Sequence, residues 1–267
     1  MLKKGRGSPI FELTKWQNLC LLVLSASRPY HPSCMYCPPV RIESCFDTTV
    51  NSESPYNSSV AISNRTIGIG LSVHTHKKGI RALGISESFR KGISKHSILA
   101  GVVMRADMII DGFTFSEVAV GGMDATHKII EMYEALDRKD INTLLLNGCV
   151  ISWYNVIDLI DVVDKIGLPL ICVTYRDSKG LETFLKENFP DDGQRRIEVY
   201  KRNGPRTPLT LHTGHTIYAR FLNISKEETS TLLDRFTFHG AIPEPLRIAR
   251  LLARSLMRRS STHAHAE

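Results

Sequence analysis

The chain has 267 residues, 42% hydrophobic and 23% charged, which is ordinary for a soluble globular protein. The net charge of +7 and pI of about 9.1 favour an acidic partner such as nucleic acid, the alternative being a solvated basic surface. No apolar run approaches the roughly 20 residues of a membrane helix, which excludes a helical membrane span. The six cysteines form no disulfide framework, so we expect a cytoplasmic protein.

Residues 1–75 differ from the rest of the chain. Ser, Asn, Pro and Thr cluster between residues 25 and 64, and no helical or strand period persists there. We therefore expect a poorly ordered extension. Cys34 and Cys37 form a C-x-x-C motif that could ligate zinc, but the motif has no second pair, and a single pair is weak evidence for such a site.

Residues 76–259 have the pattern of one compact domain, and residues 260–267 are expected to form a flexible tail. Asp111 and Gly112 predict a bend or bulge inside the third of three successive strands. The short connections between these strands favour an antiparallel meander. The three strands are predicted at Arg81–Ile85, Ser97–Arg105 and Met108–Phe115.

A helix–strand–helix–strand succession follows. Asp124 is a natural N-cap for the first helix, which begins at about Thr126, and Gly167 is a natural end for the second. This order predicts a mixed α/β sheet with helices on its faces, the order of the ribonuclease H-like fold. After the first helix the predicted elements are a strand over residues 143–148 that ends on Asn147 and Gly148, a helix at Tyr154–Ile166, a strand at Leu170–Thr174 and a helix near Gly180–Phe189.

The remaining third is predicted to be α+β. Ser225 and Glu228 have the spacing of a capping box and predict the start of a helix. A last helix is expected from Pro243 to Arg259. The two strands predicted before these helices are Ile197–Tyr200 and Ile217–Phe221.

Three residues are candidates for catalysis because they stand at or near the predicted carboxyl ends of strands, where ligands gather in open α/β sheets. Glu87 follows the first strand, Asp124 precedes the first long helix, and Asn147 lies at the end of the strand over residues 143–148. Glu87 and Asp124 are also the candidate metal ligands, because Mg²⁺ prefers hard carboxylate oxygens. The alternatives are a solvated acid for Glu87, a helix cap for Asp124 and an ordinary strand exit for Asn147.

Two groups of basic residues are candidates for contact with the phosphates of nucleic acid. The alternative for both groups is a solvated face. The first group is Arg195, Arg196, Lys201 and Arg202, and the second, a stripe along the last helix, is Arg247, Arg250, Arg254 and Arg258.

Several segments between His76 and Arg259 resemble an archaeal family named endonuclease dU, which is related to endonuclease V. The resemblance implies a ribonuclease H-like fold and a role at deaminated bases in DNA. The segments that carry it are Met123-Asp124-Ala125-Thr126, Tyr154-Asn155-Val156, Gly167-Leu168-Pro169 and Gly240-Ala241-Ile242-Pro243-Glu244-Pro245-Leu246-Arg247-Ile248-Ala249.

The chain departs from the family pattern at the positions implied to bind metal. Many members read Gly-Ile-Asp-Asp where this chain has Ser86 and Glu87, and Leu-Leu-Asp-Gly where it has Asn147. Gly121 stands at a position that is often acidic, whereas Asp124 matches a metal carboxylate of endonuclease V.

The resemblance implies an endonuclease that cuts DNA at deoxyuridine for repair, using Mg²⁺ or Mn²⁺ and no small-molecule cofactor. The departures leave a second reading open, in which the protein is a nucleic-acid-binding relative that has lost metal-binding aspartates. A structural or regulatory partner protein is a third.

Overall fold

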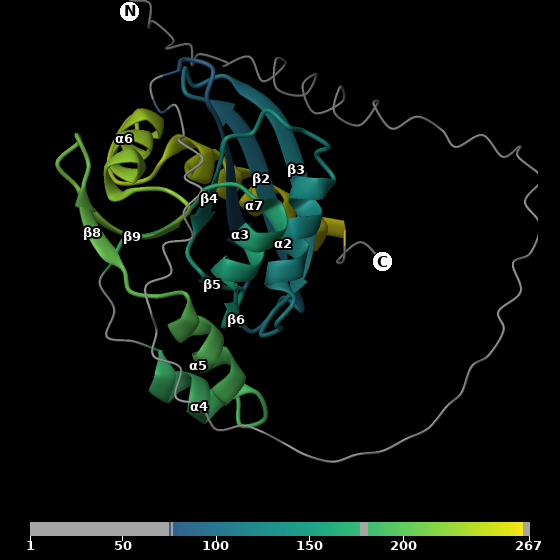
Figure 1. The fold of residues 1–267 in the computed structure, drawn as a ribbon. Coiled ribbons are helices and arrows are strands. Elements are labelled where there is room, and N and C mark those ends of the chain that lie inside the picture. Colours follow the sequence, from purple (N-terminus) through teal and green to yellow (C-terminus); the bar gives the residue numbers. More distant parts are fainter. Residues whose placement is uncertain (1–74, 76, 177–180, 264–267) are drawn as a thin grey trace, which may run out of the picture. The chain divides into compact units, whose positions relative to one another are not determined.

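The computed structural model describes residue 75 and the ranges 77–176 and 181–263 (Figure 1). The expected N-terminal extension, its C-x-x-C motif and the end of the predicted tail lie outside these residues. In the part of the chain that is described, no helix is long and apolar enough to cross a membrane.

Nine strands and six helices are described. Their bounds are β1 (Arg81–Ser88), β2 (His96–Arg105), β3 (Ile110–Ala119), α2 (Ala125–Glu134), β4 (Thr143–Asn147), β5 (Val150–Ile151), β6 (Asn155–Val156), α3 (Leu159–Ile166), β7 (Leu170–Thr174), α4 (Glu182–Asn188), α5 (Gly193–Arg202), β8 (Thr207–Thr210), β9 (Thr216–Leu222), α6 (Lys226–Phe236) and α7 (Glu244–His263).

Seven strands form one mixed sheet in the order β3-β2-β1-β4-β7-β9-β8. The meander β1–β2–β3 is antiparallel, the three central strands β1, β4 and β7 are parallel, and β9 pairs antiparallel with β7. This order confirms the predicted ribonuclease H-like mixed sheet. It also brings the carboxyl ends of β1, β4 and β7 to one edge, which we call the carboxyl edge.

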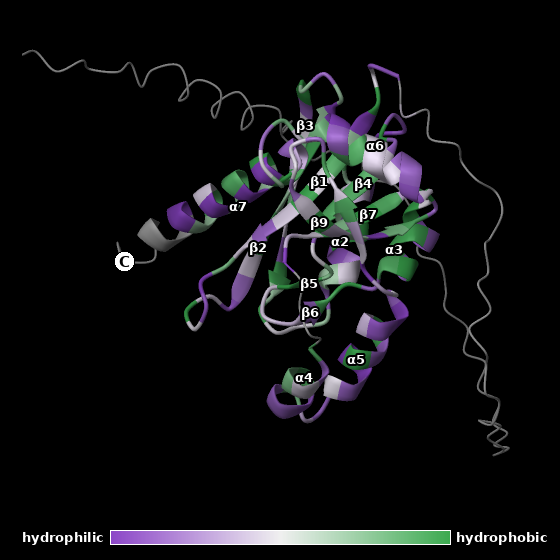
Figure 2. Cartoon of the chain, turned by 90° about the vertical axis from the view of Figure 1, so that its left-hand side faces the viewer, coloured by the Kyte–Doolittle hydropathy of each residue, from purple (hydrophilic) through white to green (hydrophobic). Residues whose placement is uncertain are grey.

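Helices cover both faces of the sheet (Figure 1). Leu144 and Leu146 of β4 face the core beneath α2 and α3, whereas Leu145 faces the core beneath α6 and α7. This division explains the unbroken apolar run of β4, because successive side chains of a strand enter opposite cores. Helix α7 alternates hydrophobic and hydrophilic residues along its length, as expected for a helix with one buried face (Figure 2).

Several local predictions are confirmed. The register of β2 and β3 shifts at Val103 and Met104, which pair with Gly112 and Ile110 and leave Asp111 as the extra residue of a bulge. Gly167 ends α3 in the left-handed conformation with φ 73°. Ser225 and Glu228 form both hydrogen bonds of the capping box.

Other local predictions are wrong. Ile197–Tyr200 is not a strand but part of α5, where Arg196 and Ile197 lie on the buried face; four residues are too few to separate the two periods. The helix predicted from Tyr154 begins instead at Leu159, after the hairpin β5–β6.

Helix α7 crosses β1 at Gly84. A Cβ at this glycine would lie 2.5 Å from Pro245 Cβ and 2.7 Å from the Pro245 carbonyl carbon. Only a residue without a side chain permits this approach, so Gly84 determines how closely the start of α7 packs on the sheet.

Candidate functional site at the carboxyl edge

The three central strands bring two of the candidate residues to the carboxyl edge. In the register of the sheet, the pairing of β1 with β4 ends at Ile85 and Leu146, so Glu87 lies two residues beyond it, and Asn147 is the last residue of β4 that pairs with β7. Glu87 and Asn147 line one small cavity between the strand ends. The predicted meeting of β1 and β4 at this edge is therefore seen.

The Glu87 carboxylate is held by serine donors. Its Oε2 atom accepts hydrogen bonds from Ser97 Oγ at 2.8 Å, from the Ser152 backbone nitrogen at 2.9 Å and from Ser152 Oγ at 2.5 Å. Oε2 therefore ties the end of β1 to the loop that follows β5. This places Glu87 in a supporting role that sequence analysis did not predict.

Asp124 stands at the N-cap position of α2, but its side chain does not cap the helix. Its Oδ2 atom accepts from the Ala119 backbone nitrogen at 3.1 Å, and its Oδ1 atom accepts from Asn155 Nδ2 at 2.6 Å. The Ala125 nitrogen at the start of α2 donates instead to Asn155 Oδ1 at 3.1 Å. The predicted cap by Asp124 is thus wrong, because the fully buried Asn155 takes that role.

Between Glu87 and Asp124 lies a turn, Ser152–Tyr154, in which three successive residues have positive φ angles of 45°, 60° and 67°. Each such residue costs about 1–3 kcal/mol unless surrounding contacts hold it. Glu87 holds the turn at Ser152, and Asp124 holds Asn155, the residue that follows it. Both predicted metal ligands therefore contact the segment 152–155, which contains this turn.

Arg196 holds the other side of the turn. Its Nη1 atom donates to Tyr154 O at 2.6 Å and Gly122 O at 2.9 Å, and its Nη2 atom donates to Gly121 O at 2.7 Å. Asp192 supplies the counter-charge. The Arg196 side chain is only 3% exposed, so the prediction that it binds nucleic acid is corrected: its donors are committed inside the protein.

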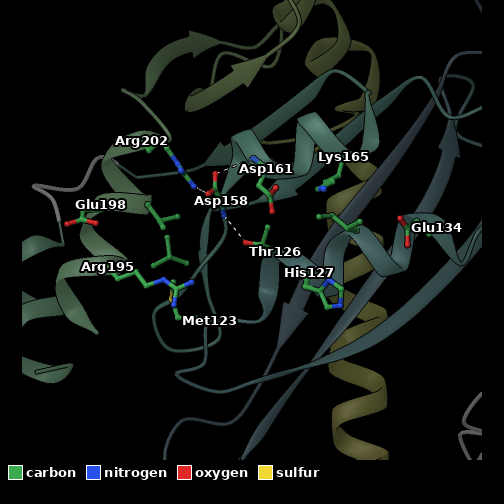
Figure 3. A pocket seen from close by; sticks show the side chains of 13 residues that line it. Met123, Thr126, His127, Glu134, Asp158, Asp161, Lys165, Arg195, Glu198 and Arg202 are labelled. Atoms are coloured by element: carbon green, nitrogen blue, oxygen red, sulfur yellow. Dashed lines mark hydrogen bonds and ion pairs between the residues drawn. The ribbon is translucent and has the colours of Figure 1, made fainter. Parts of the chain in front are cut away.

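The rest of the first basic group is exposed on α5. Arg195 and Arg202 line a groove of about 770 Å³ beside α2 and α3, where Arg202 points at Asp158 and forms an ion pair with it (Figure 3). The groove is also lined by acidic residues, including Asp161 and Glu198. Its mixed charge makes it a poor surface for a polyanion. Lys201 is exposed too.

The second basic group divides along α7. Arg247 pairs with Glu244, and Arg254 and Arg258 are exposed. Arg250 differs from them because it lines a cavity of about 730 Å³ at the carboxyl edge. The stripe is therefore not one continuous site.

This cavity, which we call the arginine cavity, lies beside the ends of β4 and β7. Asn147 lines it together with Arg176, Arg206 and Arg250, and the described lining includes no Asp or Glu. Tyr175 also lines it; burial raises the pKa of this phenol, and its hydroxyl has no hydrogen-bond partner among the described residues. Three cations and a buried hydroxyl form an environment suited to an anion.

Tyr175 and Arg176 were missed by sequence analysis although they follow β7 directly, where the strand-end rule applies. Arg206 precedes β8, and no motif around it in the sequence indicated a binding role. Its Nη1 atom donates to Arg176 O at 3.2 Å, which joins two loops that are 30 residues apart in the chain.

The matches to known proteins identify the family. A model described as Endonuclease dU matches residues 78–257. The chain belongs to the endonuclease dU family. It is 35% identical over 172 residues to a UPF0215 protein of Pyrobaculum calidifontis, covering 64% of this chain and 93% of that one.

Two solved structures are similar to this chain. A protein of unknown function from Archaeoglobus fulgidus is similar with a TM-score of 0.58 and 25% identity, over 67% of this chain and 98% of that one. Endonuclease V of Ciona intestinalis, in complex with DNA containing inosine, is similar at a lower level, with a TM-score of 0.47 and 16% identity over 68% of this chain and 87% of that one.

The residues of this endonuclease dU family member do not fit a two-metal centre. Among the described residues, no three His, Cys, Asp or Glu side chains lie together as metal ligands. Ser86 donates to Leu246 O at 2.9 Å, and Asn147 faces three arginines. Neutral and cationic groups at these places disfavour a divalent cation, which needs carboxylate charge.

Two buried thiols lie just behind this edge. Arg220 Nη1 donates to Cys149 Sγ at 3.4 Å, and Arg220 is paired across strands with Cys172. Among the described ion pairs Arg220 has no carboxylate partner. A hydrogen bond from Cys172, together with the charge of Arg220, lowers the pKa of Cys149 to about 7. We infer that the Cys149 thiolate serves as the counter-charge of the buried Arg220.

We expect the Cys149 thiolate to stabilise the fold as pH rises. The pKa is lower in the folded protein than the ordinary value of about 8.5 in an unfolded chain, so this stability is present above the unfolded pKa and is lost as pH falls through about 7. The test compares the free energies of unfolding of the wild type and Cys149→Ser between about pH 6 and pH 8.5. The wild-type advantage should grow with pH, and a constant difference would contradict a thiolate.

Proposed function

We propose that this protein binds DNA containing deoxyuridine at the carboxyl edge of its sheet and has lost two-metal cleavage. The observation that carries the proposal is the arginine cavity, in which three arginines accompany Asn147, a position where many family members carry an aspartate. Arginine side chains bind phosphate oxygens through charge-assisted hydrogen bonds. Family membership supports DNA containing deoxyuridine as the ligand.

The net charge of +7 supports the same proposal. Long-range attraction of the phosphate backbone supplies most of the non-specific affinity of such proteins and makes that affinity sensitive to salt. Arg250 contributes locally because it is only partly exposed and lines the arginine cavity.

A second candidate function is cleavage of the phosphodiester backbone at deoxyuridine. One observation favours it: Glu87 and Asn147 line the same small cavity, so a carboxylate and an amide oxygen do face a common space. The family name, which is that of an endonuclease, also favours it.

The two functions are separated by one set of assays with labelled duplexes carrying a single deoxyuridine or a thymidine. Fluorescence anisotropy measures binding at several salt concentrations, and denaturing gels measure strand cleavage with Mg²⁺, Mn²⁺ or EDTA. We expect salt-sensitive binding that is tighter with deoxyuridine, and no cleavage above the EDTA control. Metal-dependent cleavage that Glu87→Gln abolishes would establish the second function instead.

Arg250→Ala should weaken DNA binding by about tenfold, because it removes a charge-assisted contact. The slope of log affinity against log salt should also fall by about one. Lys139→Ala is the matched control, since this exposed lysine precedes β4 at the opposite edge of the sheet and its loss removes the same charge. Equal effects of the two substitutions would show that only net charge matters and would overturn the cavity as the binding site.

A further inference from the structure

The turn Ser152–Tyr154 presents an aromatic side chain beside the proposed DNA site. Its three left-handed residues include two bulky aromatics, which adopt this conformation rarely. Glu87 and Arg196 hold the turn at its two ends, at Ser152 and Tyr154. The charged side chains of Glu87 and Arg196 therefore fix the backbone on both sides of Trp153. Backbone strain of this kind clusters where a protein positions a functional group.

Trp153 lies at the margin of an aromatic cluster. The Tyr154 ring stacks on Phe184 with their centroids 4.4 Å apart, and it meets Phe189 edge to face at 5.9 Å. Among the described rings, Trp153 has two T-shaped contacts, at 5.2 Å to Tyr154 and 6.3 Å to Phe184, and no stacked one. Tyr154 and Phe184 therefore support Trp153, which is itself only partly buried.

The face of the Trp153 indole is reached by a cation. Lys91, an exposed residue of the loop between β1 and β2, places its Nζ atom 4.1 Å from the ring centroid. The contact places the end of an exposed side chain on this ring face, and such a flexible side chain can move aside for a group that approaches from solvent. It also puts a positive charge beside an open aromatic face, the combination that binds single-stranded nucleic acid through stacking and phosphate contact.

We propose that Trp153 stacks on an unpaired nucleobase of bound DNA, taking the place of Lys91 on the ring while the lysine pairs with a neighbouring phosphate. The inference rests on the proposed DNA binding and names the form of DNA that is bound. A paired base inside a duplex has both faces covered by its neighbours, so along the strand only an unpaired base can offer a face to Trp153. The site therefore takes single-stranded or locally opened DNA.

The test uses tryptophan emission. The chain has two tryptophans, Trp16 and Trp153, so the full-length Trp16→Phe protein reports on Trp153 alone. The probe is a single-stranded oligonucleotide of about 12 deoxythymidines, within the usual site size of such proteins. We expect it to quench the emission in step with binding, and we expect dextran sulfate, a polyanion without bases, to leave the emission unchanged.

Substitutions give a second readout. Trp153→Ala should weaken binding of the oligonucleotide by about tenfold, whereas Trp153→Phe should retain most of the affinity because it keeps a ring that can stack. The salt dependence should not change, since no charge is lost. Phe115→Ala is the matched control, because this ring is 45% exposed on the edge strand β3.

The outcomes distinguish this inference from the proposed function. If the oligonucleotide binds with unchanged emission, or if Trp153→Ala binds as tightly as the wild type, stacking is refuted and DNA binding stands. If neither duplex nor oligonucleotide binds at low salt, both proposals fall. Should Trp153→Ala fail to fold, as a melting curve would reveal, quenching in the Trp16→Phe protein decides the matter.

Discussion

Replacing Arg196 with methionine is expected to lower the free energy of unfolding by about 3 kcal/mol or more. The substitution keeps the length of the side chain but removes the donors to the carbonyl oxygens of Gly121, Gly122 and Tyr154. Buried acceptors without partners cost about 1–3 kcal/mol each. The strained turn at Ser152–Tyr154 would also lose its support on the side of α5.

Urea unfolding of the wild type and Arg196→Met measures this effect. Arg195→Met is the matched control, since it removes the same charge from the preceding residue of α5, which is exposed. Such a surface substitution should change stability by no more than about 0.5 kcal/mol. Similar losses in the two variants would contradict the role assigned to Arg196.

Replacing Gly84 with alanine is expected to destabilise the protein by about 3 kcal/mol. The added methyl group would lie 2.5 Å from Pro245 Cβ and 2.7 Å from its carbonyl carbon, and neither atom belongs to a flexible side chain that can move aside. Helix α7 must therefore shift away from β1, and overpacking of this kind costs about 1–3 kcal/mol or more. Because Arg250 lies on α7, we also expect weaker DNA binding.

Gly79→Ala is the control for Gly84→Ala. A Cβ at Gly79 has no atom within 4 Å, and this glycine is exposed just before β1. Thermal melting of both variants is sufficient, because the difference should amount to several degrees. An unchanged melting temperature for Gly84→Ala would mean that α7 does not pack as closely on β1 as described.

The two carboxylates that were candidate metal ligands have a common structural use. Glu87 binds Ser152, and Asp124 binds Asn155, so both stabilise the loop that presents Trp153. Each carboxylate is thus already engaged by hydrogen-bond donors of the protein itself. Glu87 and Asp124 therefore have a structural role in this chain, in which Ser86 and Asn147 stand where many family members carry aspartates.

Much of the fold could be predicted because its signals are local. The apolar run of β4 requires burial on both faces, the capping box at Ser225 needs only two side chains three residues apart, and Asp111-Gly112 marks a bulge wherever the strand pairs. Predictions that rested on short segments were wrong. Ile197–Tyr200 contains too few residues to tell a strand from a helix, and the hairpin β5–β6 has only two residues in each strand.

The candidate site was predictable in its place but not in its chemistry. By itself the sequence determined that Asn147 ends a central buried strand, that Glu87 follows its neighbour, and that the chain is basic. Only the tertiary structure decided that Arg176, Arg206 and Arg250 meet around Asn147, and that Arg196 is buried against the turn at Ser152–Tyr154. These contacts join segments far apart in the chain, and no local pattern encodes which side chains such a fold brings together.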